Sequence, residues 1–289
     1  MELPAHFQNF LANIEPTNEQ KAELSTTHAT LRSRLREDYA EYFKGSFLSG
    51  SYGRDTAIRT TKTVDIIVVT NYDRCLWEPH LLLSQLKRTL SKLYKEANIQ
   101  NGSVRIPLSW VDLNIVPAII EDRILKIPER AAYHWVPSNA HRHIQISADI
   151  DASKKGLYKP LVKALKWWRD HKMDDSWKPK SFLLECLVYD YAANSALNSV
   201  PKAVEGFLWY IHNKYKLFRE SHESSPFIRE IGAPDVNVAK SWAYRDFCNF
   251  MDAVFPSWIL SHQASDAQSK LMTVDRWRKL FGDVFPADA

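Results

Sequence analysis

Glycine and cysteine are scarce in this 289-residue sequence. Eight glycines against ten tryptophans argue against disorder and against a glycine-rich repeat protein. The three cysteines, Cys75, Cys186 and Cys248, lack paired spacing, which excludes a disulfide framework or a cysteine-rich zinc site and indicates a reducing cytoplasm. The N-terminus lacks the pattern of a signal peptide, and no apolar run approaches the roughly 18 residues of a membrane helix. The sequence therefore predicts a cytoplasmic protein with no membrane association.

The sequence has only a small excess of positive over negative charge, since the formal net charge is +4. Nucleic-acid binding is therefore not evident, because such binding usually depends on a strong basic surface. The hydrophobic share of 45% and the charged share of 25% are those of an ordinary folded protein. The length suits one large α/β unit or two smaller lobes.

The first half of the chain predicts one long helix followed by short strands. Thr17 with Gln20 three residues later forms a capping box, and no Gly or Pro occurs between them and Phe43. We therefore expect a helix that ends before Gly45. A second helix is predicted over residues 79–97. Strands are predicted where β-branched and other apolar residues gather, at Ser46–Leu48, Val64–Thr70, Val104–Pro107 and Ser109–Val116.

Helical patterns dominate after Pro137. We expect an α/β fold in two parts, with a small mixed sheet and the long helix in residues 1–145 and a helical lobe in residues 146–289. The segment 135–143 is the expected crossing point, with a cleft between the parts. The helices predicted for the lobe cover residues 156–171, 179–193, 203–215, 238–255 and 265–281.

Two of the predicted strands each carry a single aspartate among apolar residues. Asp65 lies in VDIIVV and Asp112 in WVDLNIVP. A buried carboxylate is costly unless it is paired or binds a metal, although an aspartate on the solvent face of an edge strand is as common. Upstream, Gly50-Ser51 could bring backbone and hydroxyl donors to a phosphate, although alone it is an ordinary turn. If the strands pair, these features predict a phosphate-handling site.

These residues resemble a known family. Gly50-Ser51, the spacer 52–62, the strand with Asp65 and the later strand around Asp112 are similar to the polymerase-β-type nucleotidyltransferases. The segment RDTAI after Gly53 favours the bacterial cGAS/DncV-like branch, the CD-NTases, which are related to 2′-5′-oligoadenylate synthases. The resemblance implies an enzyme that uses two Mg²⁺ (or Mn²⁺) ions, held by Asp65 and Asp112. Gly50 and Ser51 would hold the phosphates of ATP or other NTPs.

The resemblance extends into the predicted lobe. LVKALKWW matches the family helix whose lysine contacts the triphosphate, which implies Lys166. KSFLLE matches the next helix, whose first serine also contacts phosphate, which implies Ser181. Without the resemblance, Lys166 is a typical solvated helix lysine, and Ser181 is no more than a hydroxyl at a helix start. The tail from Trp277 to Pro286 is similar as well, so the match covers nearly the whole chain.

Thr63 departs from the family pattern, which has an aspartate at this position, two residues before Asp65. Threonine is neutral and a poor metal ligand, so the cation site is weakened. Three explanations remain open: a deliberate substitution that holds substrates without turnover, a natural feature of a nucleotide-binding pseudo-enzyme, or replacement by Asp55. The third is the weakest, because Asp55 lies where the family usually has glycine.

The resemblance implies that the chain joins NTPs into a cyclic or linear oligonucleotide, a second messenger of anti-phage (CBASS-type) defence that acts through a downstream effector. We expect a monomer. Thr63 makes an impaired or trapped form the expectation for this chain. Two alternatives stand beside this reading: a catalytically silent nucleotide-binding protein, and an enzyme that adds nucleotides to tRNA or to a small molecule.

Overall fold

The computed structural model describes residues 3–71 and 78–288. The chain divides into two compact units. The core unit comprises Pro16–Ile144, and the helical unit comprises Met1–Glu15 with Gln145–Ala289. The sequence division had assigned all of residues 1–145 to the core. Helix α1 (Pro4–Ile14) instead groups with the helices of the second half.

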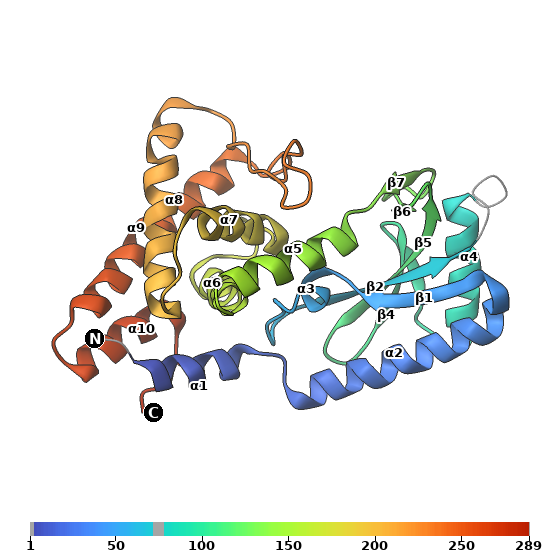
Figure 1. The fold of residues 1–289 in the computed structure, drawn as a ribbon, viewed down its shortest axis with the longest axis horizontal. Helices are drawn as coiled ribbons and strands as arrows, with labels where there is room; N and C mark the ends of the chain where they lie inside the picture. Colours follow the sequence, from blue (N-terminus) through green and yellow to red (C-terminus); the bar gives the residue numbers. More distant parts are fainter. Residues whose placement is uncertain (1–2, 72–77, 289) are drawn as a thin grey trace. The chain divides into compact units, whose positions relative to one another are not determined.

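The core unit is built on a mixed seven-stranded sheet (Figure 1). Strands β2 and β5 are parallel neighbours, and every other pairing is antiparallel. The order is β1-β2-β5-β4-β3, and β6 and β7 extend from β5. The strands are β1 (Phe43–Leu48), β2 (Thr63–Thr70), β3 (Asn98–Gln100), β4 (Ser103–Pro107), β5 (Asp112–Glu121), β6 (Ile124–Pro128) and β7 (Trp135–Pro137).

Helices α2 (Asn18–Tyr39) and α4 (Pro79–Leu90) pack with one face of this sheet. Alternation along β2 decides which residues enter that core, because side chains of a strand point to opposite faces in turn. Val64, Ile66 and Val68 belong to the cluster with both helices, whereas Ile67 and Val69 belong to a smaller cluster on the other face. Thr63 and Asp65 therefore share the face of Ile67.

The capping box at the start of α2 is confirmed. The Gln20 backbone N–H donates to Thr17 Oγ1 at 3.2 Å, and the Thr17 backbone N–H donates to Gln20 Oε1 at 2.9 Å. The helix ends at Tyr39, and a short 3-10 turn, η1 (Ala40–Tyr42), leads into β1. Strand β1 thus begins at Phe43, earlier than the predicted Ser46.

The helical unit is held together by aromatic residues from both ends of the chain. Phe7 and Phe10 of α1 pack against Trp277, Phe281 and Phe285, and the Phe10 and Phe281 ring centroids lie 4.4 Å apart. Helix α6 contacts both α1 and α10. Besides α1, the unit contains α6 (Tyr158–Lys172), α7 (Ser181–Asn194), α8 (Val200–Ser221), α9 (Tyr244–Asp266) and α10 (Lys270–Phe281); helix α5 (Ala140–Ser153) contains the boundary between the units.

Several element boundaries differ from the predictions. Helix α4 ends at Leu90 rather than Ala97, since residues after it turn into β3. Strand β5 begins at Asp112, because the Leu108 N–H bonds the Val111 carbonyl and forms a turn there. Helix α9 continues through Pro256 to Asp266, beyond the predicted end at Phe255. Helix α5 was not predicted.

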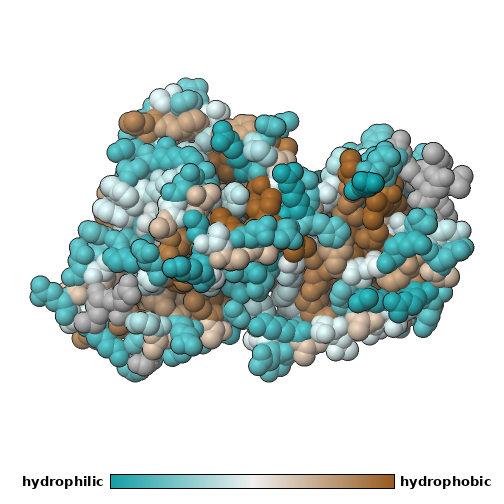
Figure 2. Space-filling view, viewed as in Figure 1, coloured by the Kyte–Doolittle hydropathy of each residue, from teal (hydrophilic) through white to brown (hydrophobic). Residues whose placement is uncertain are grey.

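The surface is consistent with the composition. In Figure 2, hydrophobic residues form a brown patch over the strands of the core unit, and the exposed side of α2 is mostly hydrophilic. Within residues 3–71 and 78–288, none of the helices combines the length and the hydropathy needed to span a membrane.

Candidate functional site

Strands β2 and β5 bring the predicted aspartates onto one surface. The parallel register places Thr63 opposite Asp112 and Asp65 opposite Asn114. Because Leu113 and Ile115 belong to the same core cluster as Val64 and Ile66, the polar residues of both strands lie on the opposite face. The pairing that the sequence left conditional therefore exists, and it adds Asn114 to the predicted set.

Gly50 lies directly against the Asp65 carboxylate. It begins the single-turn helix α3 (Gly50–Gly53) after β1, and the Ser49 N–H donates to the Asp65 carbonyl oxygen at 2.8 Å. Gly50 has a φ of +59°, and a Cβ built on it would lie 2.6 Å from Asp65 Oδ2. Both facts favour glycine here. The Gly50-Ser51 turn and the Asp65 strand, which the sequence assigned to one site, therefore meet at Gly50.

The backbone beyond Gly50 is fixed by local bonds. The Thr56 N–H donates to the Ser51 carbonyl oxygen at 2.8 Å, which folds the loop back on α3. Tyr52 packs against the core, and burial raises the pKa of its phenol to about 12. It therefore stays neutral at physiological pH.

Each aspartate has a partner from a neighbouring strand. Arg105 Nη2 donates to Asp112 Oδ1 at 2.8 Å and forms an ion pair with Asp112 Oδ2 at 2.7 Å. Asn114 Nδ2 donates to Asp65 Oδ1 at 3.0 Å. The sequence reading did not identify Arg105 or Asn114. Both become visible only with strand pairing, since Arg105 lies opposite Asn114 across β4 and β5.

A pocket of about 270 Å³ opens over this surface. The turn between β3 and β4 forms one side of it, with Gln100, Asn101 and Ser103. Asn101 and Gly102 have φ values of +49° and +75°, as expected for the two-residue hairpin that an Asn-Gly pair favours. That dipeptide was the available signal for β3 and for this side of the pocket. The other lining residues are Thr63, Asp65, Arg105, Asp112, Asn114 and Val116.

The donor set does not fit a site for two divalent ions. Asp65 and Asp112 offer the hard oxygen ligands that Mg²⁺ prefers, but each already accepts a hydrogen bond or ion pair from this chain. Thr63 adds no charge. Across residues 3–71 and 78–288, no group of three or more His, Cys, Asp or Glu side chains could hold a metal ion. Asp55, in the left-handed region at φ +56°, does not line the pocket.

The two predicted phosphate contacts of the second half lie in the helical unit. Lys166 on α6 is 2% exposed, and its Nζ lies 2.7 Å from Glu185 Oε1 on α7. Ser181 is the first residue of α7, and its hydroxyl accepts a hydrogen bond from Arg169 Nη1 at 3.0 Å. Their contact with a triphosphate stays a prediction, and Lys166 would have to leave Glu185 to make it.

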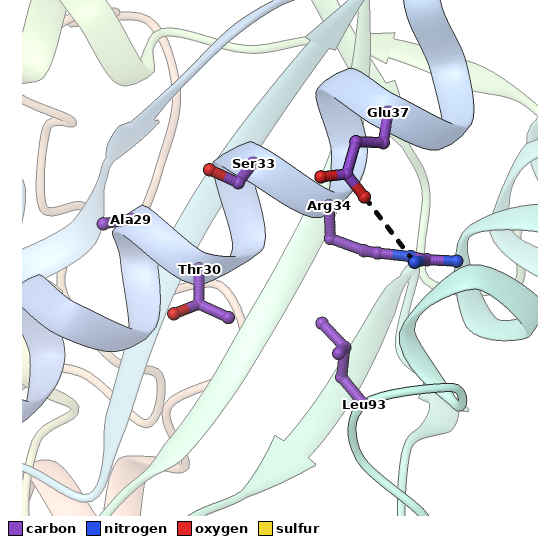
Figure 3. A pocket seen from close by; sticks show the side chains of 6 residues that line it. All are labelled: Ala29, Thr30, Ser33, Arg34, Glu37 and Leu93. Atoms are coloured by element: carbon purple, nitrogen blue, oxygen red, sulfur yellow. Dashed lines mark ion pairs between the residues drawn. The ribbon is translucent and has the colours of Figure 1, made fainter.

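A second hollow, of about 420 Å³, lies between α2 and the segment after α4 (Figure 3). Its charged groups are Arg34 and Glu37, whose side chains form an ion pair at 3.7 Å along the helix. It contains no pair of carboxylates. The remaining lining residues are Ala29, Thr30, Ser33 and Leu93.

Comparison with known proteins assigns the class. A family model described as the Second Messenger Oligonucleotide or Dinucleotide Synthetase (SMODS) domain matches residues 1–150, which include the whole β2–β5 site. A cyclic AMP-AMP-AMP synthase of Acinetobacter sp. is 29% identical over 302 residues, covering 100% of this chain and 87% of that protein. A cyclic AMP-AMP-GMP synthase of Enterobacter hormaechei is 26% identical, with coverage of 99% and 92%.

Solved structures share the fold. Escherichia coli MS115-1 CdnC with ATP gives a TM-score of 0.75 at 19% identity, covering 98% of each chain. Vibrio cholerae DncV, a cyclic AMP-GMP synthase, gives 0.74 at 12% identity, covering 95% of this chain and 93% of that chain. The chain belongs to the SMODS family of cGAS/DncV-like nucleotidyltransferases, the CD-NTases. The predicted family and the polymerase-β-like α/β fold are confirmed.

Proposed function

We propose that the β2–β5 pocket binds ATP and other NTPs and joins them into a cyclic oligonucleotide, at a rate that Thr63 greatly reduces. The product would be a second messenger of CBASS-type defence that acts on a downstream effector. The two relatives described above are named for products that contain AMP, which supports ATP as one substrate.

One observation carries this proposal: Asp65 and Asp112 lie on adjacent parallel strands, on one face, with Gly50 against Asp65. In the proposed reaction, a ribose hydroxyl oxygen bonds to the α-phosphorus of an NTP. The bond from that phosphorus to the bridging oxygen breaks, and pyrophosphate leaves. The Asp112 carboxylate would accept the hydroxyl proton. Gly50 and Ser51 would hold the phosphates, and positioning would supply much of the rate enhancement.

A completed cation site belongs to the same proposal. In Thr63→Asp, the carboxylates of Asp65, Asp112 and the substituted position would hold two Mg²⁺ or Mn²⁺ ions, which would supply charge stabilisation to the transferring phosphate. Asp at position 63 would lie opposite Asp112 in the strand register. Loss of such a ligand can cost several orders of magnitude in rate, since each tenfold is about 1.4 kcal/mol of barrier.

A second candidate function is nucleotide binding without turnover. The observation in its favour is that Arg105 already donates to Asp112 and Asn114 already donates to Asp65. Such a protein would hold NTPs in the pocket and release them unchanged. It would then act by sequestering nucleotides or by presenting them to a partner.

Incubation of the chain and of Thr63→Asp with radiolabelled NTP mixtures and Mg²⁺ separates the candidates. The synthase proposal expects phosphatase-resistant oligonucleotide from Thr63→Asp and little from the parent. Binding of ATP by both proteins, with no product from either, would favour the silent form. Label transferred to added tRNA would instead support the tRNA-modifying alternative.

A further inference from the structure

The charges that line the β2–β5 pocket nearly cancel. Asp65 and Asp112 contribute two negative charges, and Arg105 contributes one positive charge; the other lining residues are neutral. A divalent cation is held by charge as well as by geometry. A pocket with one net negative charge is therefore a poor cation site, whatever the shape of its oxygen ligands.

Arg105 is placed to cancel Asp112 in particular. Its Nη2 donates a charge-assisted hydrogen bond to Oδ1 and lies within ion-pair distance of Oδ2, so the guanidinium charge faces both carboxylate oxygens. The side chains of Arg105 and Asp112 are 34% and 30% exposed, so the pair stays accessible from the pocket. A cation that approaches Asp112 would therefore be repelled by the guanidinium charge beside it.

Asn114 acts on the other carboxylate in a weaker way. Its side-chain amide donates to Asp65 Oδ1, whereas Oδ2 lies beside Gly50, which has no Cβ to crowd it. The amide carries no net charge, so it lowers the ligand capacity of Asp65 without cancelling its charge. Of the two contacts, the Arg105 ion pair should dominate.

We infer that Arg105 is an internal counter-ion that takes the place of a divalent cation beside Asp112 and sets the cation affinity of this site. Thr63 accounts for only part of the low cation affinity. This inference rests on the proposed function for the identity of the site, but it concerns cation binding alone. The neutral substitution Arg105→Gln releases Asp112, whereas Arg105→Lys keeps the positive charge beside it.

Mn²⁺ binding to the whole chain without nucleotide tests the inference, with free Mn²⁺ followed by electron paramagnetic resonance. Removing one opposing charge a few ångströms from the ion should tighten binding by about tenfold. We expect that gain for Arg105→Gln, and little change for Arg105→Lys. Arg123→Gln is the matched control, because it removes the same charge from an exposed turn of the core unit.

A double substitution makes the test specific to Asp112. If Arg105 cancels the charge of Asp112, Asp112→Asn alone should weaken Mn²⁺ binding, because the Arg105 charge is then uncancelled. Arg105→Gln/Asp112→Asn should lose the gain and bind Mn²⁺ about as the parent does, because its net pocket charge is the same. Circular dichroism shows whether each variant folds. Equal Mn²⁺ affinity of the parent and folded Arg105→Gln, or an equal gain from Arg123→Gln, would overturn the inference. Because no NTP is present, failure of oligonucleotide synthesis leaves this result unaffected.

Discussion

Gly50 is the residue at which the Gly50-Ser51 turn contacts the Asp65 carboxylate. Its φ of +59° and the 2.6 Å separation between a built Cβ and Asp65 Oδ2 predict two costs for Gly50→Ala. Left-handed backbone in a non-glycine residue costs roughly 1 kcal/mol, and the clash adds to it, for a total of roughly 2–3 kcal/mol. Urea unfolding of the variant gives this value directly.

Gly156→Ala is the matched control for backbone strain. Gly156 has a φ of +75°, but a Cβ there would meet no atom within 4 Å. It should lose only the backbone part, roughly 1 kcal/mol. Equal losses for both variants would show that the Asp65 contact does not constrain position 50.

For single residues, the sequence could predict those that a short motif marks. Gly50, Asp65 and Asp112 could be proposed as site residues because each lies in a short diagnostic segment. Arg105 and Asn114 could not, because their role depends on the register of three strands. A one-residue shift would move every side chain of a strand to the other face, and no short segment fixes that register.

Among the elements, helices α6 and α7 are joined by the buried Lys166–Glu185 pair, with side chains 2% and 1% exposed. Removing one member of a buried ion pair is strongly destabilising, so Lys166→Met should cost about 3–5 kcal/mol in unfolding free energy. Lys166→Met with Glu185→Leu should recover most of that loss. A loss below about 1 kcal/mol for Lys166→Met alone would contradict a structural role for the pair.

Helices α8 and α9 are joined by a pH-dependent contact. The Glu205 carboxylate, 2.9 Å from His262 Nδ1, raises the pKa of that imidazole. A raised folded pKa gives stability that is present below the unfolded value of 6.5 and lost as pH rises through the folded pKa. The pKa of Glu205 is lowered: burial opposes the shift, and bonds from Ser265, His262 and Lys202 outweigh it.

His262→Gln should therefore destabilise the protein more at pH 5.5 than at pH 8.5. The difference should stay within about 1 kcal/mol, because the imidazole is largely exposed. Ser265→Ala serves as the control, since it removes a neutral donor to Glu205. Thermal unfolding across this pH range measures both. A His262→Gln effect that is the same at both pH values would show that the ion pair contributes nothing.

The sequence predicted the elements better than their ends. The capping box fixed the start of α2, because both of its hydrogen bonds are local. The end predicted for α9, at Phe255, was wrong, since the helix continues through Pro256 to Asp266. Packing can outweigh one lost backbone hydrogen bond, and packing is not visible in a local pattern.

At the scale of the whole molecule, helix α1 packs against helix α10 within the helical unit. Phe10 is fully buried and stacks on Phe281. Phe10→Ala should cost about 3–5 kcal/mol, whereas Phe227→Ala, at a side chain 55% exposed, should cost little. Hydrogen exchange should show lost protection in α6 and α10 with protection of β2 and β5 retained. Equal losses in both units would contradict their separate compactness.

The central claim is that the chain carries the synthase site of its family and that Thr63 lowers the reaction rate at this site. The most direct measurement is the initial rate of phosphatase-resistant oligonucleotide formation from ATP and mixed NTPs. Thr63→Asp should exceed the parent by several orders of magnitude. Thr63→Asp/Asp65→Asn supplies the background rate. If Thr63→Asp forms no more product than that double variant, with every NTP mixture, the β2–β5 pocket is not a synthase site.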